Sequence, residues 1–488
     1  MHLKKVLFSV SLMTFLLTIN VSLAQQQFTL YHMPVLSQST YLNAASVPEH
    51  KVSLTLPGTS VFFGFNNSAF NVKSLLDKQG NLHYAKFVEG LKESNNYVGA
   101  GATVDLFHLR FKAANNFFSV SSRFINDTRF LFPKDLLGVG STGFQDQYNL
   151  SGLGIHSSTY IENAVGFTRV KPDSKWTYGG RVKLLHGIAN VQTDRSDFKL
   201  NVNQEGTYNY DLALDAEVNT SIGLNENVID DLDELSNLTS LADYQNAIQL
   251  NQGFAIDGGV TYQYSDRLSF GLAANDIGFI NWKSYARNYR AQLNTSFDGV
   301  VFEDFQNLDI DTDSLVNHFE EQLNQGTDTT KNAYRTWLPA NLFLSAHYQL
   351  SPKVKASASL YSEFFRGVAL GATAGLNVSL GRGLDLTTSW WYSRRSAANM
   401  GIGLVFKPKW IQFHLILDNV LPASLVEIND SDLGVEKLVL PYHAKNFNVR
   451  FGINLVFGTI KNESMLPAQG LKKRKNAFRK YLYKPSSN

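Results

Sequence analysis

The sequence contains no cysteine, which excludes a disulfide framework, a thiolate metal site and a cysteine nucleophile. Its 44 basic and 42 acidic residues leave a net charge of +2, so no strong overall field recruits nucleic acid. Beyond the N-terminus, no run reaches the about 18 apolar residues that a transmembrane helix requires. These absences exclude a cysteine-stapled domain and a helical membrane protein.

The N-terminus has the pattern of an export signal. Lys4 and Lys5 form a basic region, Val6 to Ile19 is apolar, and Ser22-Leu23-Ala24 has the small residues of a cleavage site. The apolar core is too short for a membrane anchor. Residues 1–24 are therefore predicted to be a cleaved signal peptide.

Seven consecutive segments between Asn341 and Phe457 alternate apolar residues with small or polar ones. In one of them, Val368, Leu370, Ala372, Ala374, Leu376, Val378 and Leu380 occupy alternate positions. Successive side chains of a strand point to opposite faces of a sheet, so a period of two predicts strands. Short turns such as Ser351-Pro352-Lys353 and Lys407-Pro408-Lys409 separate the segments, which indicates an antiparallel meander.

A soluble sandwich and a membrane barrel both produce this alternation. The segments are about 10–13 residues long, longer than most globular strands. Aromatic residues gather at segment ends, as at Trp390-Trp391-Tyr392, Phe406, Trp410 and Phe457, like the girdles of outer-membrane barrels. We therefore predict an all-β, transmembrane, antiparallel up-and-down barrel of about 14–16 strands over residues 25–457, with short helices in long outer loops.

Loop lengths and charge give the expected orientation. An even-stranded barrel has both termini in the periplasm and its long loops outside. No Lys or Arg occurs from Leu200 through Asp266 or from Ala291 through Thr330, so the long loops are acidic. Residues 458–488 are basic and are predicted to form a periplasmic tail, either disordered or tethered electrostatically to a membrane face or a partner.

Several motifs resemble those of a Bacteroidota outer-membrane barrel family of unknown function. Gly253–Tyr262 and Leu272–Trp282 resemble its paired hairpin, and Tyr41–Glu49 with Leu56-Pro57-Gly58 resembles its opening segment. Leu417–Val420 resembles a hairpin in relatives of the long-chain fatty-acid transporter superfamily. The resemblance implies an outer-membrane barrel with no assigned reaction.

These motifs also have a structural interpretation. An aspartate at a strand end can accept backbone N–H groups of the following turn, and glycine permits a positive φ. We therefore interpret the motif residues as hairpin caps, with a ligand role as the alternative. They are Asp257, Asp276, Gly278, Trp282, Asp418 and Asn419.

One loop resembles a calcium site in its spacing. Asp309, Asp311, Asp313 and Glu320 occupy positions one, three, five and twelve of a calcium-binding loop. Ser314 stands where that loop needs glycine. The favoured interpretation is a helix start with acidic residues at its N-terminus, and calcium is the alternative. No other cofactor is expected.

Ionisable residues also occur on the polar faces of the strands. Glu363, Asp385, Arg395 and His414 are predicted to form a polar network in the lumen, because unpaired buried charges are costly. No serine is spaced to pair with a histidine as a nucleophile and base, so we expect no enzymatic activity.

Two functional hypotheses remain. The first is a non-enzymatic surface component of the envelope that works with protein partners, in secretion or assembly. The second is a passive importer of hydrophobic small molecules, which an apolar pocket in the lumen and a lateral gap in the wall would favour. Outer-membrane lipid is an expected partner in both, and nucleic acid in neither.

Overall fold

A computed structural model describes most of the chain. The described residues are 27–68, 84–138, 146–171, 174–203, 209–222, 250–298, 326–381, 383–393, 396–419, 425–430, 435–441 and 446–460. Among their helices, none is long and apolar enough to cross a bilayer.

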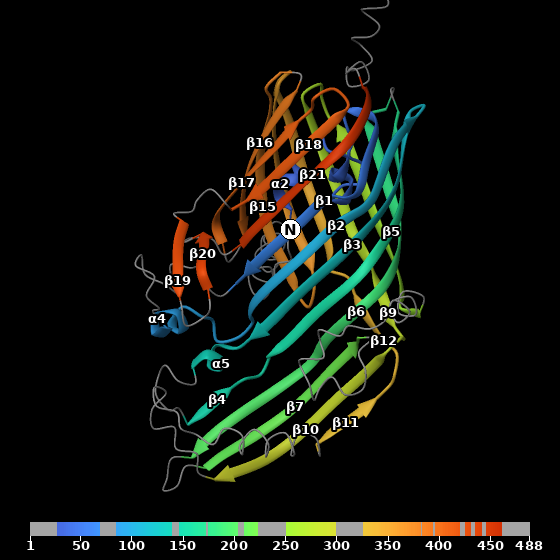
Figure 1. Ribbon diagram of the computed structural model, residues 1–488. Coiled ribbons are helices and arrows are strands. Elements are labelled where there is room, and N and C mark those ends of the chain that lie inside the picture. The colour runs from blue at the N-terminus through green and yellow to red at the C-terminus, as the bar shows by residue number, and fades with distance from the viewer. Residues whose placement is uncertain are drawn as a thin grey trace, which may run out of the picture.

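The described strands form a closed antiparallel barrel of 14 strands (Figure 1). β1 pairs with both β2 and β21, which closes the ring. The predicted all-β barrel is confirmed. Around the ring lie β1 (His50–Asn67), β2 (Asn96–Ala113), β3 (Asn116–Phe132), β5 (Gly154–Val170), β6 (Trp176–Asn203), β8 (Gln252–Gln263), β9 (Leu268–Trp282), β13 (Ala340–Ser351), β14 (Val354–Phe364), β15 (Val368–Ser379), β16 (Leu384–Ser393), β17 (Ser396–Phe406), β18 (Ile411–Asp418) and β21 (Asn446–Thr459).

One end of the barrel carries short turns, and the other carries the long connections. At the turn end lie the first residue of β1 and the last residue of β21, since His50 pairs with Thr459. The loop end holds α4 (Tyr84–Glu89), α5 (Lys134–Gly138) and the hairpin β19 (Leu425–Asp430) to β20 (Val435–Pro441). Short helices therefore lie within the long connections, as predicted.

A sheet extends beyond the barrel at the loop end. The second half of β6 leaves the ring and pairs with β7 (Asn209–Ser221), which pairs with β10 (Ala286–Asp298). Shorter strands complete the pairing: β11 (Thr327–Thr330) on β10, β4 (Gln147–Asn149) on β6 and β12 (Tyr334–Trp337) on β9. We call β4, the end of β6, β7, β10 and β11 the extension.

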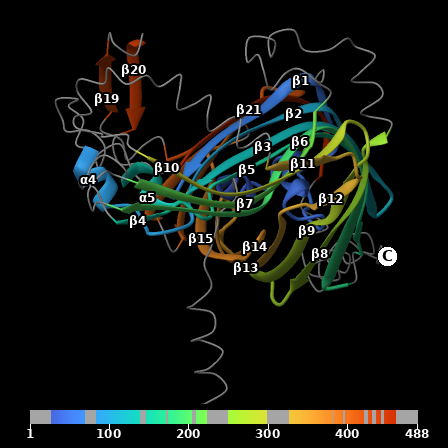
Figure 2. The ribbon, with the colours of Figure 1, turned by 90° about the horizontal axis from the view of Figure 1, so that it is seen from below.

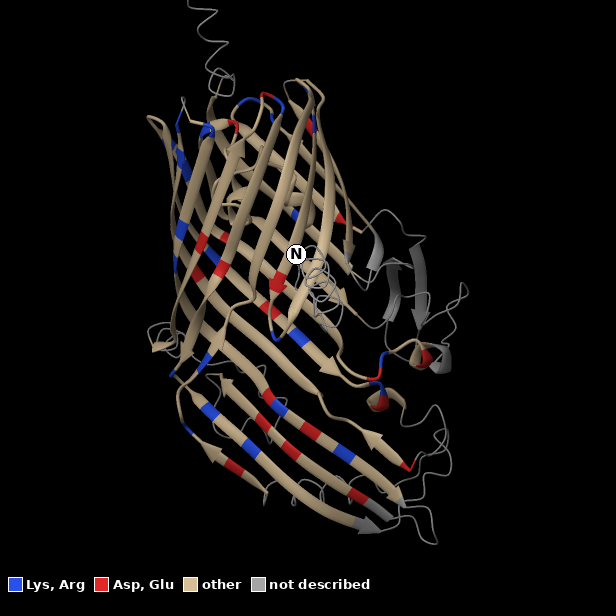
Figure 3. Cartoon of the chain, turned by 180° about the vertical axis from the view of Figure 1, so that it is seen from behind, with Lys and Arg blue, Asp and Glu red and all other residues tan. Residues whose placement is uncertain are grey.

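Charged residues of both signs lie along the strands of the extension (Figure 3). The pairing register aligns Arg195, Glu217, Arg290 and Asp328 across four strands. Opposite charges on directly paired residues stabilise a sheet. Among the described strands, β7 pairs only with strands of the extension and lies outside the ring.

The barrel is apolar outside and polar inside. Large outward side chains are exposed, among them Leu184 at 57%, Leu360 at 60% and Phe63 at 52%, while inward Lys183, Glu363 and Thr387 are fully buried. A protein that folds in water has the reverse arrangement. The outer surface therefore fits a lipid environment, which is consistent with the outer membrane.

Exposed aromatic side chains occupy the two ends of this outer surface. This is the girdle arrangement of barrels that meet two membrane interfaces. The turn end carries Trp176, Tyr264, Tyr348, Trp410 and Phe457, and the loop end carries Phe65, Trp337, Phe364, Trp390 and Tyr392.

Replacing outward Leu360 by Arg should destabilise the folded barrel by about 2–4 kcal/mol, because Leu360 lies midway along β14, at the depth farthest from either interface. The same change at Leu380, beside the turn end, should cost only about 0–1 kcal/mol. Urea unfolding in lipid vesicles, followed by tryptophan fluorescence, measures both values. Equal losses at the two positions would contradict a lipid-facing wall.

Candidate functional site

An N-terminal segment fills part of the lumen. Residues 27–49, which we call the plug, precede β1 and contain α2 (Phe28–Tyr31) and the 3-10 helix η1 (Ser37–Tyr41). Every residue of both helices is buried. Figures 1 and 2 show this blue segment inside the ring of strands. The lumen is therefore occupied by the chain itself.

Short hydrogen bonds join the plug to the wall. Thr29 Oγ1 lies 2.6 Å from Ser389 Oγ and also donates to Asp418. Most of the wall partners are hydroxyl or amide groups, which exchange readily with water when separated. Further bonds run from Tyr31 to Ser345 at 2.9 Å, from Gln38 to Asn454 at 2.8 Å, from Thr168 to the carbonyl of Ala44 at 2.7 Å and from Asn275 to the carbonyl of Leu42 at 2.9 Å.

His32 of the plug sits in a close-fitting recess of the wall. Its Nδ1 lies 2.6 Å from Ser357 Oγ and its Nε2 lies 2.8 Å from Thr373 Oγ1. A Cβ at Gly375 would lie 2.4 Å from Cγ of His32. The small residues on the inner faces of β14 and β15 therefore leave the space that the plug fills.

Aromatic rings line the lumen around α2. Phe28 lies 5.0 Å from Trp391 and 5.2 Å from Tyr361, centroid to centroid. Tyr31 stacks on Phe343 at 4.4 Å, and Phe343 lies 5.0 Å from Tyr361. Phe343, Tyr361 and Trp391 form what we call the aromatic chamber, and two plug rings occupy it.

A network of buried charges crosses the opposite part of the wall. Glu162 accepts hydrogen bonds from Arg123 at 2.7 Å and from Arg181 at 3.2 Å. Lys183 lies 2.7 Å from Asp257, 3.3 Å from Glu162 and 2.5 Å from Asp276, and Arg181 bonds to Asp257 at 2.9 Å. Three cations and three carboxylates therefore balance, which buried charge requires.

The plug reaches this charge network through Tyr41. The guanidinium of Arg123 lies 4.0 Å from the ring centroid of Tyr41, that of Arg181 lies at 5.1 Å and that of Arg450 at 5.9 Å. Cation–π attraction is strongest where water is excluded. Arg450 also pairs with Asp105 at 3.5 Å. The end of η1 is therefore held by positive charge from three strands.

Two predicted cap residues belong to the charge network. Asp257 and Asp276 both pair with Lys183, and Asp257 Oδ1 accepts the backbone N–H of Asp276 at 2.8 Å. Asp276 lies inside β9, not at a strand end, and has a φ of 59°. The pairing register shifts there between Ile256 and Gly258. The motif therefore marks a bulge that directs Asp276 toward Lys183.

The other residues of that motif pack the wall. A Cβ at Gly278 would lie 2.2 Å from the carbonyl oxygen of Phe254, so glycine is needed here for close approach, and the positive φ belongs to Asp276. Trp282 is fully buried and its Nε1 donates to Thr336 at 2.8 Å.

Asp418 and Asn419 do lie at a strand end. β18 ends at Asp418, whose carboxylate accepts from Thr29 of the plug. Asn419 has a φ of 62°, and its Oδ1 accepts the backbone N–H of Met400 at 2.9 Å. Asn419 thus caps the strand, while Asp418 contacts the plug.

The predicted lumen residues that the structure describes do not bond to one another, and each has different surroundings. Glu363 bonds to Arg129 at 3.3 Å and to Tyr361 at 2.8 Å, toward the loop end. Asp385 bonds to Ser379 at 2.6 Å and pairs with Lys407, toward the turn end. His414 is buried, and neither ring nitrogen has a hydrogen-bond partner among the described residues. Arg395 lies outside the described residues.

The candidate calcium residues Asp309, Asp311, Asp313 and Glu320 also lie outside the described residues. Within the described part of the chain, no group of three or more His, Asp or Glu side chains is arranged to hold a metal ion.

The pattern of alternating residues does not reveal the plug. One signal was present: no Lys, Arg, Asp or Glu occurs from Gln25 through Pro48. An uncharged segment of that length with no strand periodicity is suited to a buried, hydrogen-bonded position.

The fold and its filled lumen define a closed outer-membrane type of barrel that is plugged by its own N-terminal segment. The chain belongs to a family of unknown function, DUF5723, whose model matches residues 45–418. The predicted membership of a family without assigned function is thereby confirmed. No curated protein matches the sequence.

Several solved barrels are similar to this chain. The Ralstonia pickettii toluene transporter TbuX has 9% identity and a TM-score of 0.40, covering 85% of this chain and 92% of its own. The Pseudomonas putida toluene transporter TodX has 11% identity and a TM-score of 0.36, covering 87% and 95%. A Pseudomonas aeruginosa FadL homologue has 12% identity and a TM-score of 0.37, covering 85% and 91%.

Replacing Glu162 by Gln should destabilise the barrel by about 3–5 kcal/mol, because Arg123, Arg181 and Lys183 would lose a shared buried carboxylate. The control is Asp215→Asn in the extension, which breaks the solvent-exposed pair with Arg195 and should have little effect on stability. Urea unfolding in detergent micelles measures both. A loss for Glu162→Gln no greater than the control's would contradict the network's role.

Acidification should loosen the plug. Burial, and after it the nearby Lys355, lowers the pKa of His32 to about 4; a released His32 would titrate near its ordinary pKa of about 6.5. The released plug then binds the proton more readily, so docking is fully stable above about pH 6.5 and weakens toward pH 4, by at most about 3 kcal/mol.

Hydrogen exchange of residues 28–41, corrected for the intrinsic pH dependence, measures this effect. Exchange should rise below about pH 6.5, and His32→Gln should flatten the profile. His186→Gln, on β6 and outside the plug contacts, is the control. An unchanged profile in His32→Gln would assign the pH response to another group.

Proposed function

We propose that the protein is a non-enzymatic, plugged channel of the outer membrane that passes small hydrophobic molecules. The observation that carries this proposal is the aromatic chamber. Its three wall rings, Phe343, Tyr361 and Trp391, are 1–3% exposed and are covered by Phe28 and Tyr31 of the plug. Withdrawal of α2 would uncover an apolar, concave surface, which is the kind of site that hydrophobic ligands occupy.

An irregularity in β1 supports a side exit through the wall. Pairing with β2 and with β21 is interrupted between Thr55 and Ser60 on both sides. Pro57 lacks a backbone donor and Gly58 has a φ of 71°. A bulge with no paired backbone on either side is the part of a closed wall that separates most easily. This supports release of an apolar molecule sideways into lipid.

The proposed orientation follows from the same features. The plug joins β1 at the turn end, where β21 also ends, and we assign this end to the periplasm. The long connections and the extension then lie outside the cell. Molecules would enter at the loop end and leave through the wall once the plug had moved.

Locking the plug should abolish passage. Because the chain has no cysteine, Thr29→Cys with Ser389→Cys introduces one pair alone, at hydroxyls 2.6 Å apart. A disulfide needs sulfurs about 2.0 Å apart, within reach of a small adjustment. Uptake of 1-N-phenylnaphthylamine into vesicles should fall to background on oxidation and recover on reduction.

The matched control is a disulfide that leaves the plug free. Thr128→Cys with Ser157→Cys joins β3 to β5 within the wall, where the hydroxyls lie 2.8 Å apart, and oxidation should leave uptake unchanged. Each single-cysteine variant should also be insensitive to oxidant. Full uptake with the plug demonstrably locked would refute the channel proposal.

A surface role with protein partners is the second candidate. The extension favours it, because its strands stand clear of the barrel and carry charges of both signs in register (Figure 3). Such a patterned surface suits a complementary envelope or secretion protein. A stoichiometric partner that co-purifies from native membranes would favour this role over a channel that acts alone.

A further inference from the structure

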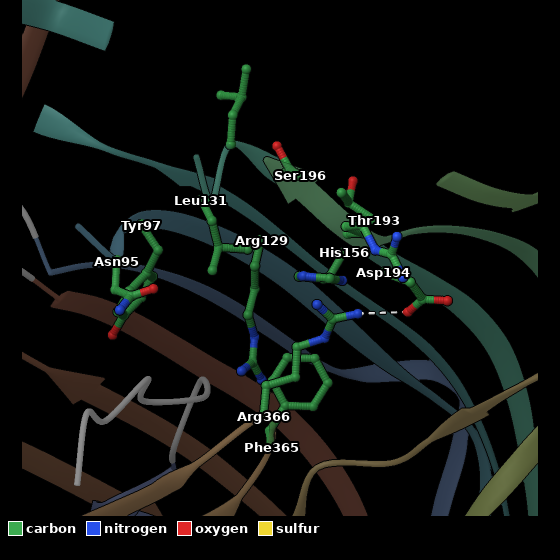
Figure 4. A pocket seen from close by; sticks show the side chains of 14 residues that line it. Asn95, Tyr97, Arg129, Leu131, His156, Thr193, Asp194, Ser196, Phe365 and Arg366 are labelled. Carbon is green, nitrogen blue, oxygen red and sulfur yellow. Dashed lines mark hydrogen bonds and ion pairs between the residues drawn. The ribbon is translucent and has the colours of Figure 1, made fainter. Parts of the chain in front are cut away.

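A cavity of about 310 Å³ opens at the loop end, and none of its lining residues belongs to the plug. Figure 4 shows its side chains, which come from the ends of β2, β3 and β5, from β6 where it leaves the ring, and from the turn after β14. Arg129, His156, Asp194, Arg195, Phe365 and Arg366 are its chemically distinctive residues. Three of these six are arginines and one is an acid.

Two ion pairs join opposite sides of the barrel at this cavity. Arg129 of β3 bonds to Glu363 of β14 at 3.3 Å, and both side chains are almost fully buried. Arg366 bonds to Asp194 at 2.7 Å, from the β14–β15 turn to β6. In this part of the lumen, arginine side chains therefore already pair with carboxylates of the protein itself. A carboxylate that entered the cavity would therefore meet arginine side chains of the kind that already bind carboxylates here.

Two buried nitrogens at the cavity have no acceptor. Arg129 is 2% exposed and its Nε finds no hydrogen-bond partner among the described residues, although its terminal nitrogens contact Asp127 and Glu363. His156 is 8% exposed and its Nδ1 is also without a partner in the described part of the chain. Buried polar nitrogens are normally satisfied, so these two indicate room for a ligand, and Arg129 Nε–H requires an acceptor atom there.

Phe365 fixes the orientation of both groups. The guanidinium of Arg129 lies 4.5 Å from the centroid of the Phe365 ring, and the ring of His156 meets it edge-on at 5.8 Å. Leu131 and Leu153 add apolar surface to the cavity wall. The cavity thus combines a cationic, donor-rich side with an apolar side.

We propose that this cavity binds a small organic carboxylate. Its carboxylate would contact Arg129 Nε, His156 and Arg366, and its carbon body would lie against Phe365, Leu131 and Leu153. The volume is near the lower limit of ligand cavities, about 300 Å³, so the ligand is compact. Arg195 and Arg366 outnumber Asp194 at the rim, although Arg195 also pairs with Asp215 at 3.0 Å. This proposal does not depend on the channel function.

Calorimetry of the purified barrel in detergent tests the proposal with benzoate as the probe. Binding should be saturable, with one site per chain. Arg366→Gln should weaken it about tenfold, since one charge-assisted hydrogen bond is lost. Phe365→Ala should weaken it as well, and its unfolding curve shows whether the variant is folded.

The matched control is Arg335→Gln. Arg335 is also a loop-end arginine over a phenylalanine, 4.1 Å from the ring of Phe279, and it bonds to Asn281, but it lies outside the cavity. Benzoate affinity should be unchanged in this variant.

Three results would overturn the proposal. One is the absence of saturable heat with benzoate, and another is equal affinity in wild type and Arg366→Gln. The third is inorganic phosphate or glucose binding as tightly as benzoate, since the cavity would then recognise a bare anion or a neutral polyol. Failure here leaves the plug-locking result untouched, and the reverse also holds.

Discussion

The interior of this barrel depends on paired charge that is sealed from water. Arg123, Arg181 and Lys183 face Glu162, Asp257 and Asp276 on five neighbouring strands, and most of these side chains are less than a tenth exposed. Each ion alone would be costly to bury, so the six stabilise the fold only as a set. The set also gives the wall a defined inner face: a register slip of one residue would place these charges in lipid. Lipid outside and charge inside therefore specify the same strand register. Tyr41 then positions the plug against the charged inner face of the wall.

The period of two predicts the architecture because lipid favours apolar side chains on the outer face of every wall strand. Most outward positions of the wall strands from β13 to β21 are apolar, so the alternation is clean there and the strands are recognisable from the sequence alone. Upstream the pattern is less regular, for physical reasons that the structure identifies. β1 bulges between Thr55 and Ser60, the register of β2 with β3 shifts between Asp105 and Phe107, and β6 leaves the ring after pairing with β5. A bulge reverses which side of the strand faces lipid, and the extension has no lipid face to enforce the alternation.

The candidate site is less accessible to sequence reasoning, because it depends on partners from distant strands. The alternation of side chains along each strand places Glu363, Asp385 and His414 on the inner face, and all three are buried. Their contacts could not be inferred, since Arg129 is 234 positions from Glu363. The plug contacts are still less predictable: Thr29 meets Ser389 and Asp418 through hydroxyl and carboxyl groups that have no distinctive local pattern. Only the absence of charge before Glu49 points to burial of the N-terminal segment.

Two sets of contacts with different chemistry cross the lumen. At the plug, hydroxyls, amides and ring stacking hold α2 and η1, and water replaces such contacts at modest cost because each contributes only about 0.5–1.5 kcal/mol. At the loop end, the Arg129–Glu363 pair spans the barrel. Separating it would leave the buried Glu363 without its cation, at a cost of several kcal/mol, while Arg129 would keep Asp127. A neutral apolar molecule offers no charge to either residue, whereas a carboxylate offers Arg129 another acceptor. The plug is therefore suited to reversible movement, while the loop-end pair is suited to hold its position until an ion replaces one of its members.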